Sequence, residues 1–184
     1  MITIIILCML TYAFYIGASR GLTLQLIYSV GYTLSYIVAA FLYRGVGRAI
    51  ELWVPYPSAT LESRMVFFNQ DTALQLDKSF YAGMGFLIVY FLGYLVVRLI
   101  GLLAHSLADI RMFGELNRVL GGLAGAFAVY IGIFLVLSIL SLVPINGLQD
   151  LLGNDLLAKM IIQYTPIFSS DIHHLWIVDI LGKI

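Results

Sequence analysis

The sequence predicts an all-α integral membrane protein with four transmembrane helices, and its composition and hydropathy pattern support that prediction. Hydrophobic residues make up 61% of the 184 residues and charged residues only 11%, against about 25% in an average soluble domain. Four long stretches contain no Asp, Glu, Lys or Arg, and a membrane span needs about 20 helical residues. The formal net charge is zero. The composition excludes a disordered chain and argues against nucleic-acid binding, which needs a clustered basic surface.

The first two spans, about 2–19 and 22–43, are separated only by Arg20 and Gly21. So short a connection requires a very tight turn, and we expect Gly21 to adopt a positive φ there. Arg20 would then lie at the membrane face, where its long side chain can reach the lipid headgroups. One long bent helix across both stretches is the alternative.

Two further spans follow the long polar loop 44–79 in the sequence. The third covers about 80–103 and continues past one charged residue, Arg98. The fourth covers about 119–143, because Pro144 cannot continue a helix. We expect the whole chain, 1–184, to form a single membrane domain.

The polar loop 44–79 predicts an amphipathic segment at the membrane surface. Between Leu61 and Thr72, apolar side chains recur at helical spacing, with most charged side chains off that stripe. A short helix of this kind lies in the membrane interface rather than across it.

The tail 144–184 predicts two further interfacial helices, both too short to span the membrane. Asn154 and Asp155 can cap the first. Ser170 and Asp171 can cap the second, which Gly182 would end.

Small residues recur on one face of the fourth span, at Gly121, Gly125, Ala128 and Gly132, and a weaker stripe in the second span includes Gly31. This spacing lets two helix backbones approach closely in lipid. Packing inside the chain, a homodimer interface and the lining of a narrow pore all fit the spacing.

Arg118 precedes the glycine stripe, and Glu115, one turn earlier, can pair with it. The structural interpretation is capping of the helix end. The functional interpretation makes Arg118 a partner for a buried carboxylate, a phospholipid headgroup or an anion. The candidate residues for helix packing or partner contact are therefore glycines and arginines: Arg20, Gly21, Gly31, Arg118, Gly121, Gly125 and Gly132.

No catalytic or metal-binding motif is present in the sequence. It contains no G-x-S-x-G, H-E-x-x-H, Walker A or G-x-G-x-x-G pattern. The single Cys8 excludes a disulfide framework. His173 and His174 are adjacent, so on a helix they point in different directions and chelate one metal poorly. We expect no enzymatic activity, no cofactor and no metal.

Two motifs give the chain a family resemblance. Residues 19–22, Ser-Arg-Gly-Leu, join the first two spans and precede Gln25, and residues 118–121, Arg-Val-Leu-Gly, open the fourth span before Gly125. In order and layout these resemble the colicin V production protein (CvpA) family of bacterial inner-membrane proteins. The resemblance covers roughly residues 1–145.

The resemblance implies a bacterial plasma-membrane protein needed for toxin (bacteriocin) production or export, with a broader envelope role. Relatives often carry acids where this chain has Gln25 and Asn117. The expected partners are the lipid bilayer and either a second copy or another membrane protein, with no nucleic acid. A small oligomeric transporter or channel and a structural or lipid-interacting protein are the alternatives. Basic residues in the short loops favour both termini outside.

Overall fold

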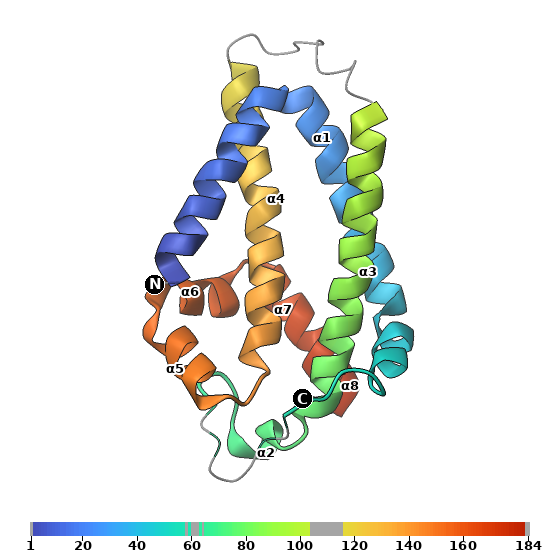
Figure 1. Ribbon diagram of the computed structural model, residues 1–184, viewed down its shortest axis with the longest axis vertical. Helices are drawn as coiled ribbons and strands as arrows, with labels where there is room; N and C mark the ends of the chain where they lie inside the picture. The colour runs from blue at the N-terminus through green and yellow to red at the C-terminus, as the bar shows by residue number, and fades with distance from the viewer. Residues whose placement is uncertain (1, 58, 60–62, 64, 104–115, 183–184) are drawn as a thin grey trace. The chain divides into compact units, whose positions relative to one another are not determined.

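The computed structural model describes residues 2–57, 59, 63, 65–103 and 116–182, and all secondary structure in these residues is helical (Figure 1). Three of the helices, α1, α3 and α4, are long and apolar enough to cross a membrane. In chain order the elements are α1 (Ile2–Ile50), α2 (Gln70–Ala73), α3 (Leu76–Leu103), α4 (Leu116–Ser141), α5 (Asn146–Asn154), α6 (Leu156–Tyr164), α7 (Phe168–His173), the π-helix η2 (His174–Val178) and α8 (Asp179–Leu181).

Helix α1 contains both of the first two predicted spans. Its backbone leaves helical geometry at Gly21, where φ is 76° and ψ is 168°. The expected positive φ is confirmed, and this combination of angles is essentially confined to glycine. In Figure 1 the two arms of α1 on either side of Gly21 run in opposite directions. Because the two stretches form one element, four separate transmembrane helices are not confirmed.

The other long helices begin and end near the predicted positions. Helix α3 begins at Leu76 rather than at residue 80, with Asp77 in its first turn. The positive end of the helix dipole stabilises an acid there, so a charged side chain does not delay the helix. Helix α4 ends at Ser141, shortly before Pro144, as proline geometry requires.

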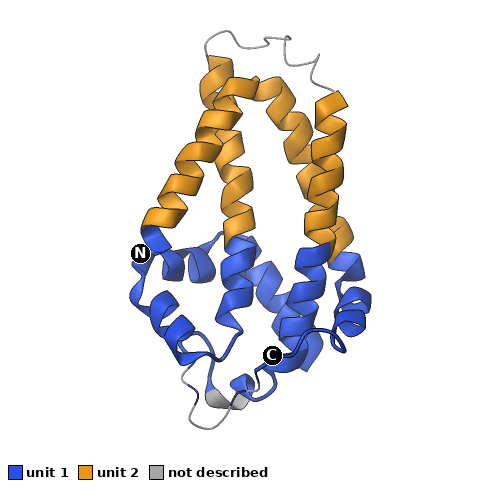
Figure 2. Cartoon of the chain, in the orientation of Figure 1, with its two compact units in different colours: residues 1–3, 40–88, 134–184 blue, residues 4–39, 89–133 orange. Residues whose placement is uncertain are grey.

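The chain divides into two compact units (Figure 2). Unit 1 consists of residues 1–3, 40–88 and 134–184, and unit 2 consists of residues 4–39 and 89–133. Each of the three long helices contributes residues to both units.

In unit 2 the second arm of α1 packs antiparallel to α3. A Cβ added at Gly31 would lie 2.6 Å from the Val97 side chain, and one added at Gly93 would meet the Ser35 side chain. The earlier residue of α1, Gly31, thus lies against the later residue of α3, Val97, so the two helices run in opposite directions. The small residues allow this close approach, which holds helices together in lipid through dispersion contacts.

In unit 1 the end of α1 packs on the start of α3 at two other glycines. A Cβ added at Gly47 would lie 2.7 Å from the carbonyl oxygen of Tyr81, and one added at Gly85 would meet the backbone carbonyl of Tyr43. The two helix backbones are thus in direct contact. Neither glycine was among the residues predicted to pack helices.

The end of the tail packs against α3 within unit 1. The indole ring of Trp176 is 2% exposed, contacts Phe86 edge-to-face at 5.7 Å between centroids, and covers Gly83. The Tyr43 hydroxyl donates a hydrogen bond to the Leu175 carbonyl at 3.1 Å. These contacts fix the tail to the long helices.

The predicted tail helices are partly corrected. Asp155 caps α6 as expected, accepting the Ala158 N–H at 3.1 Å. Ser170 and Asp171 do not cap the last helix, because α7 begins at Phe168 after a Thr-Pro pair and places both residues inside it. Gly182 ends α8 in the left-handed conformation, as predicted.

Two further expectations about the polar segments differ from the structure. The described residues 63 and 65–69 are not helical, and helix begins only with the single turn of α2, so the amphipathic helix expected from Leu61 to Thr72 is not confirmed. Helix α5 was not expected, because the first helix of the tail was predicted to begin only at the Asn154–Asp155 cap.

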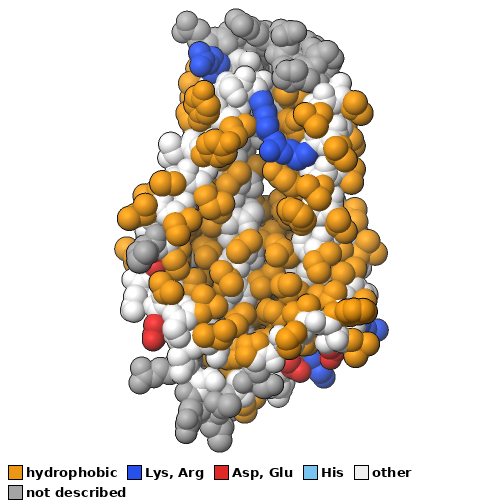
Figure 3. Space-filling model, in the orientation of Figure 1, with side chains coloured by type: hydrophobic (Ala, Val, Ile, Leu, Met, Phe, Trp, Pro, Cys, Tyr) orange, Lys and Arg blue, Asp and Glu red, His pale blue; other side chains and the backbone are white. Residues whose placement is uncertain are grey.

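Many large hydrophobic side chains on the long helices point outward (Figure 3). Examples are Tyr15, Phe41 and Leu103, which are 71%, 80% and 87% exposed. A soluble monomer rarely exposes so much contiguous apolar surface. These side chains are suited to contact with lipid acyl chains.

Asp155 links the start of α1 to the α5–α6 junction. Its carboxylate accepts the Thr3 N–H at 2.9 Å, the Thr3 hydroxyl at 2.6 Å and the Ala158 N–H. Partial burial raises the pKa of Asp155, but the hydrogen bonds from Thr3 and Ala158 outweigh this and leave its pKa below the usual value.

We expect acid to weaken this junction. A carboxyl group whose pKa is lower in the folded state stabilises the fold above its unfolded pKa, and this stabilisation is lost as the pH falls through the folded pKa. The melting temperature of the purified protein should therefore drop as the pH falls below about 4, and less so in Asp155→Asn. Asp150→Asn, at an exposed position in α5, is the control. Equal acid sensitivity in both variants would contradict the assignment.

Candidate functional site: a glycine contact and an arginine–tyrosine cluster

The predicted glycine stripe of α4 contacts the first arm of α1 in unit 2. A Cβ added at Gly121 would lie 2.7 Å from both the carbonyl oxygen of Gly17 and the carbonyl carbon of Gly21. A Cβ added at Gly17 would in turn meet the Gly121 carbonyl oxygen. The two backbones touch, so neither position has room for a side chain.

Other predicted stripe residues lie in different environments. Gly125 continues the contact, because a Cβ there would lie 2.9 Å from the Ala13 carbonyl oxygen and 3.0 Å from the Gly17 Cα. Gly31 faces α3 instead, and around Gly132 no atom lies within 4 Å of an added Cβ in the described structure. The structure therefore brings together Gly21, Gly121 and Gly125, while Gly31 and Gly132 lie elsewhere.

Asn117 closes the break in α1. Its side-chain Oδ1 accepts the Leu22 N–H at 2.9 Å, and the side chain is 6% exposed. The first N–H groups of a helical segment lack partners within that segment, so Asn117 satisfies one of them from another helix. A Cβ at Gly21 would collide with the Asn117 amide, which adds a steric reason for glycine to its positive φ.

We expect Asn117→Leu to destabilise the protein and Asn117→Asp to be tolerated. Loss of a helix-capping side chain costs about 1 kcal/mol, and leaving the partly buried Leu22 N–H unsatisfied adds up to about 1–3 kcal/mol. Aspartate keeps an acceptor oxygen for the Leu22 N–H. Thermal unfolding in detergent, followed by circular dichroism, measures the difference. Equal melting temperatures for the two variants would contradict this role.

Two arginines lie at the ends of a series of tyrosine rings in the same unit. The Arg20 guanidinium lies 4.8 Å from the centroid of Tyr28, and the Arg98 guanidinium lies 5.6 Å from that of Tyr94. Between them, Tyr32 stacks on Tyr28 at 6.1 Å and on Tyr94 at 5.0 Å. Both Tyr28 and Tyr32 are buried, so the rings form a fixed support for the two cations.

Among the described residues of unit 2, no acid neutralises the positive charge of this cluster. Residues 4–39, 89–103 and 116–133 contain three arginines and no Asp or Glu. The third, Arg118, is exposed in the first turn of α4. Its proposed partner Glu115 lies outside the described residues, so their pairing stays a prediction.

Gln25 lies in the same unit and is 2% exposed. Its Oε1 atom is buried, with no hydrogen-bond donor in the described part of the chain. A buried amide oxygen without a donor is costly, and it marks a polar position inside the packed helices.

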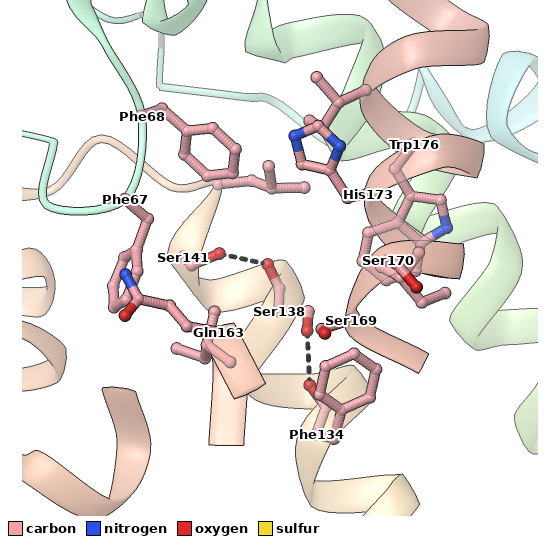
Figure 4. A pocket seen from close by; sticks show the side chains of 14 residues that line it. Phe67, Phe68, Phe134, Ser138, Ser141, Gln163, Ser169, Ser170, His173 and Trp176 are labelled. Atoms are coloured by element: carbon pink, nitrogen blue, oxygen red, sulfur yellow. Dashed lines mark hydrogen bonds between the residues drawn. The ribbon is translucent and has the colours of Figure 1, made fainter. Parts of the chain in front are cut away.

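Unit 1 contains a cavity of about 480 Å³ between α4, α6 and the α7–η2 segment (Figure 4). Aromatic and aliphatic side chains form much of its wall, together with several hydroxyl groups. Ser138 and Ser141 donate their hydroxyl protons to carbonyls of their own helix at 2.8 and 2.7 Å, and Ser170 donates to the Ile167 carbonyl. The hydroxyl protons of these three serines are therefore already used, and the cavity is the weaker candidate site.

Of this cluster, the sequence placed Arg20 among the candidate residues but neither Arg98 nor the tyrosines. Tyr28 and Tyr32 are four residues apart on one helix, as are Tyr94 and Arg98 on another, and this spacing places each pair on one helix face. This spacing is the only sign of the cluster in the sequence. It does not show that the face of α1 with the first pair meets the face of α3 with the second.

Comparison with known proteins agrees with the membrane fold. The sequence profile of the family described as "Colicin V production protein" matches residues 2–166. A protein of Bacillus subtilis (strain 168), described as uncharacterized transmembrane protein YshB, is 30% identical over 177 residues, covering 96% of this chain and 97% of its own length. No solved structure matches the chain.

Proposed function

Because the chain belongs to the colicin V production protein family, we propose that it is a non-enzymatic plasma-membrane protein that supports bacterial toxin production or export and the integrity of the cell envelope. It acts by packing against a second copy or another membrane protein. The family match and the apolar outer surfaces of α1, α3 and α4 support this proposal.

We propose that α1 crosses the membrane twice. The stretches 2–20 and 22–43 on either side of Gly21 are each about 28–33 Å long at 1.5 Å per residue, which matches a hydrocarbon core of about 30 Å. The positive φ of Gly21 and the reversal of direction there support a helical hairpin. With α3 and α4 this gives four crossings, with both termini outside, as the basic residues of the short loops favour.

The contact between α1 and α4 has a structural part in the proposed function. Gly17, Gly121 and Gly125 are occupied by contacts within the chain, so these residues are not free to bind a partner. A partner would therefore contact the outward-facing surfaces of the long helices. Gly132 lies at such a surface, since no described atom lies within 4 Å of a Cβ added there. The glycine contact therefore acts as an internal scaffold that holds such surfaces in place.

Deletion of the gene in a toxin-producing host tests the proposal. We expect toxin activity in the culture medium to fall relative to toxin inside the cells, and sensitivity to detergent to rise. A plasmid copy of the unsubstituted protein should restore both, whereas Gly121→Leu should not. Unchanged export together with unchanged detergent sensitivity would contradict the proposal. Crosslinking in intact cells followed by mass spectrometry then identifies the partner.

A second candidate function is an oligomeric transporter for anions. The observation in its favour is the excess of arginine over acid in unit 2. Reconstituted liposomes loaded with a chloride- or phosphate-sensitive dye test it. Flux that is lost in Arg98→Gln would support transport, and the absence of flux would leave the scaffold role.

A further inference from the structure

We propose that Arg20 and Arg98, held against Tyr28, Tyr32 and Tyr94, form a binding site for a phosphate group. The group is carried either by the headgroup of an anionic phospholipid or by free phosphate. This inference rests on the geometry of unit 2 and does not depend on the role in toxin export.

The two arginines lie over the two end rings of one tyrosine series, Arg20 over Tyr28 and Arg98 over Tyr94. Arg20 covers the face of Tyr28. The hydroxyl edge of that same ring lies directly against Gly101, which is one turn from Arg98 in α3. The packing of α1 on α3 thus places Arg20 and Arg98 on the same series of rings, although they are far apart in the sequence.

The guanidinium groups are positioned but keep their binding capacity. Each lies over a tyrosine ring, and such contact uses the flat face of the group and leaves the N–H edges free. Neither arginine has a carboxylate within salt-bridge distance in the described part of the chain, whereas Arg44 of unit 1 is paired with Asp179 at 3.2 Å. Both are only partly exposed.

Two partly buried cations without an anion are unfavourable, and an anion between them relieves this. Phosphate fits best because each guanidinium can donate two parallel hydrogen bonds to its oxygens. A carboxylate has only two oxygens, which two guanidinium groups would have to share. The hydroxyls of the neighbouring tyrosines are additional donors of the kind that phosphate accepts.

Native mass spectrometry of the full chain, purified in detergent and depleted of lipid, tests the site. The probes are dioleoyl phosphatidylglycerol, dioleoylglycerol, which lacks the phosphate, and inorganic phosphate. The variants are Arg20→Gln/Arg98→Gln, Arg98→Lys and, as the matched control, Arg118→Gln, which removes the same charge from an exposed arginine of the same unit. Circular dichroism checks the helix content of each.

We expect phosphatidylglycerol, but not dioleoylglycerol, to bind the unsubstituted protein and Arg118→Gln equally. The double variant should bind at least about tenfold more weakly, because several charge-assisted hydrogen bonds are lost. Arg98→Lys should show an intermediate loss, since it keeps the charge but not the planar group. If the double variant does not fold, the Arg98→Lys result decides.

Competition between inorganic phosphate and phosphatidylglycerol shows which of the two carries the bound phosphate group. Inorganic phosphate that binds alone and displaces the lipid would identify free phosphate as the ligand, and lipid binding unaffected by inorganic phosphate would identify the headgroup. The inference is overturned if neither phosphatidylglycerol nor inorganic phosphate binds. It is also overturned if Arg118→Gln weakens binding as much as the double variant, or if Arg98→Lys binds as well as the unsubstituted protein.

Discussion

Gly121→Leu is expected to prevent the stable folding of the helices in unit 2. A Cβ at this position would lie 2.7 Å from backbone atoms of both Gly17 and Gly21 and 2.9 Å from the Leu22 nitrogen. Overpacking an apolar core already costs about 1–3 kcal/mol. Here the colliding atoms are backbone, which cannot rotate away, so we expect a loss above about 3 kcal/mol.

Gly132→Leu in the same helix is the matched control. It makes the same substitution in α4 where nothing lies within 4 Å of an added Cβ in the described structure. Replacing glycine within a helix otherwise stabilises it, by about 0.5–1 kcal/mol for alanine. We therefore expect Gly132→Leu to accumulate in membranes like the unsubstituted protein and Gly121→Leu to be degraded or aggregated.

Fluorescence-detected size-exclusion chromatography of tagged proteins, followed by thermal melting of each peak, measures both effects. A Gly121→Leu variant that elutes and melts like the unsubstituted protein would show that α1 and α4 do not touch. Gly121→Ala gives a graded test, because even one methyl group meets the opposing backbone.

The glycine spacing could be predicted from the sequence, but its partner could not. Small residues at positions four apart show that a helix face permits close contact. They do not distinguish α1 of the same chain from a second copy. In this chain the opposing surface includes Gly17 and Gly21, and only the geometry of the turn at Gly21 brings those residues to Gly121.

The arginine–tyrosine cluster shows a similar limit. The sequence predicts that Arg20 lies at the membrane face but not which side chains it contacts, because hydropathy places a residue along the membrane normal and not around the helix axis. The rotation of α3 relative to α1 depends on Gly93 and Gly101, which admit Ser35 and Tyr28. That packing sets which side chains meet.

Gln149 is the polar residue whose loss should be most damaging in unit 1. It lies within an uncharged run of the sequence, where hydropathy gives it no special role. In the structure it is fully buried. Its Nε2 donates to the carbonyls of Ser141 and Val143 at 3.0 and 2.8 Å, and its Oε1 accepts the Val66 N–H at 3.1 Å. One side chain thus closes the end of α4 and anchors the loop before α2.

Gln149→Leu should lower the free energy of unfolding by about 2–4 kcal/mol. The substitution keeps the approximate volume but removes the partner of the Ser141 carbonyl and of the Val66 N–H, at about 1–3 kcal/mol for each fully buried group and less where water can reach. The Val143 carbonyl keeps the Ile145 N–H at 2.9 Å. The carbonyls at a helix end have no partner within the helix, so α4 cannot compensate. Gln149→Glu should be similarly harmful, because it keeps the acceptor for Val66 but loses both donated hydrogen bonds.

Gln163→Leu, at an exposed position in α6, makes the same chemical change without breaking these contacts. Chemical unfolding of the detergent-solubilised protein, followed by circular dichroism, compares the three variants. If Gln149→Leu unfolds at the same denaturant concentration as Gln163→Leu, the end of α4 is held by other contacts. If it unfolds earlier, a single amide determines how the fourth apolar run ends, since Pro144 only limits how far the helix can extend.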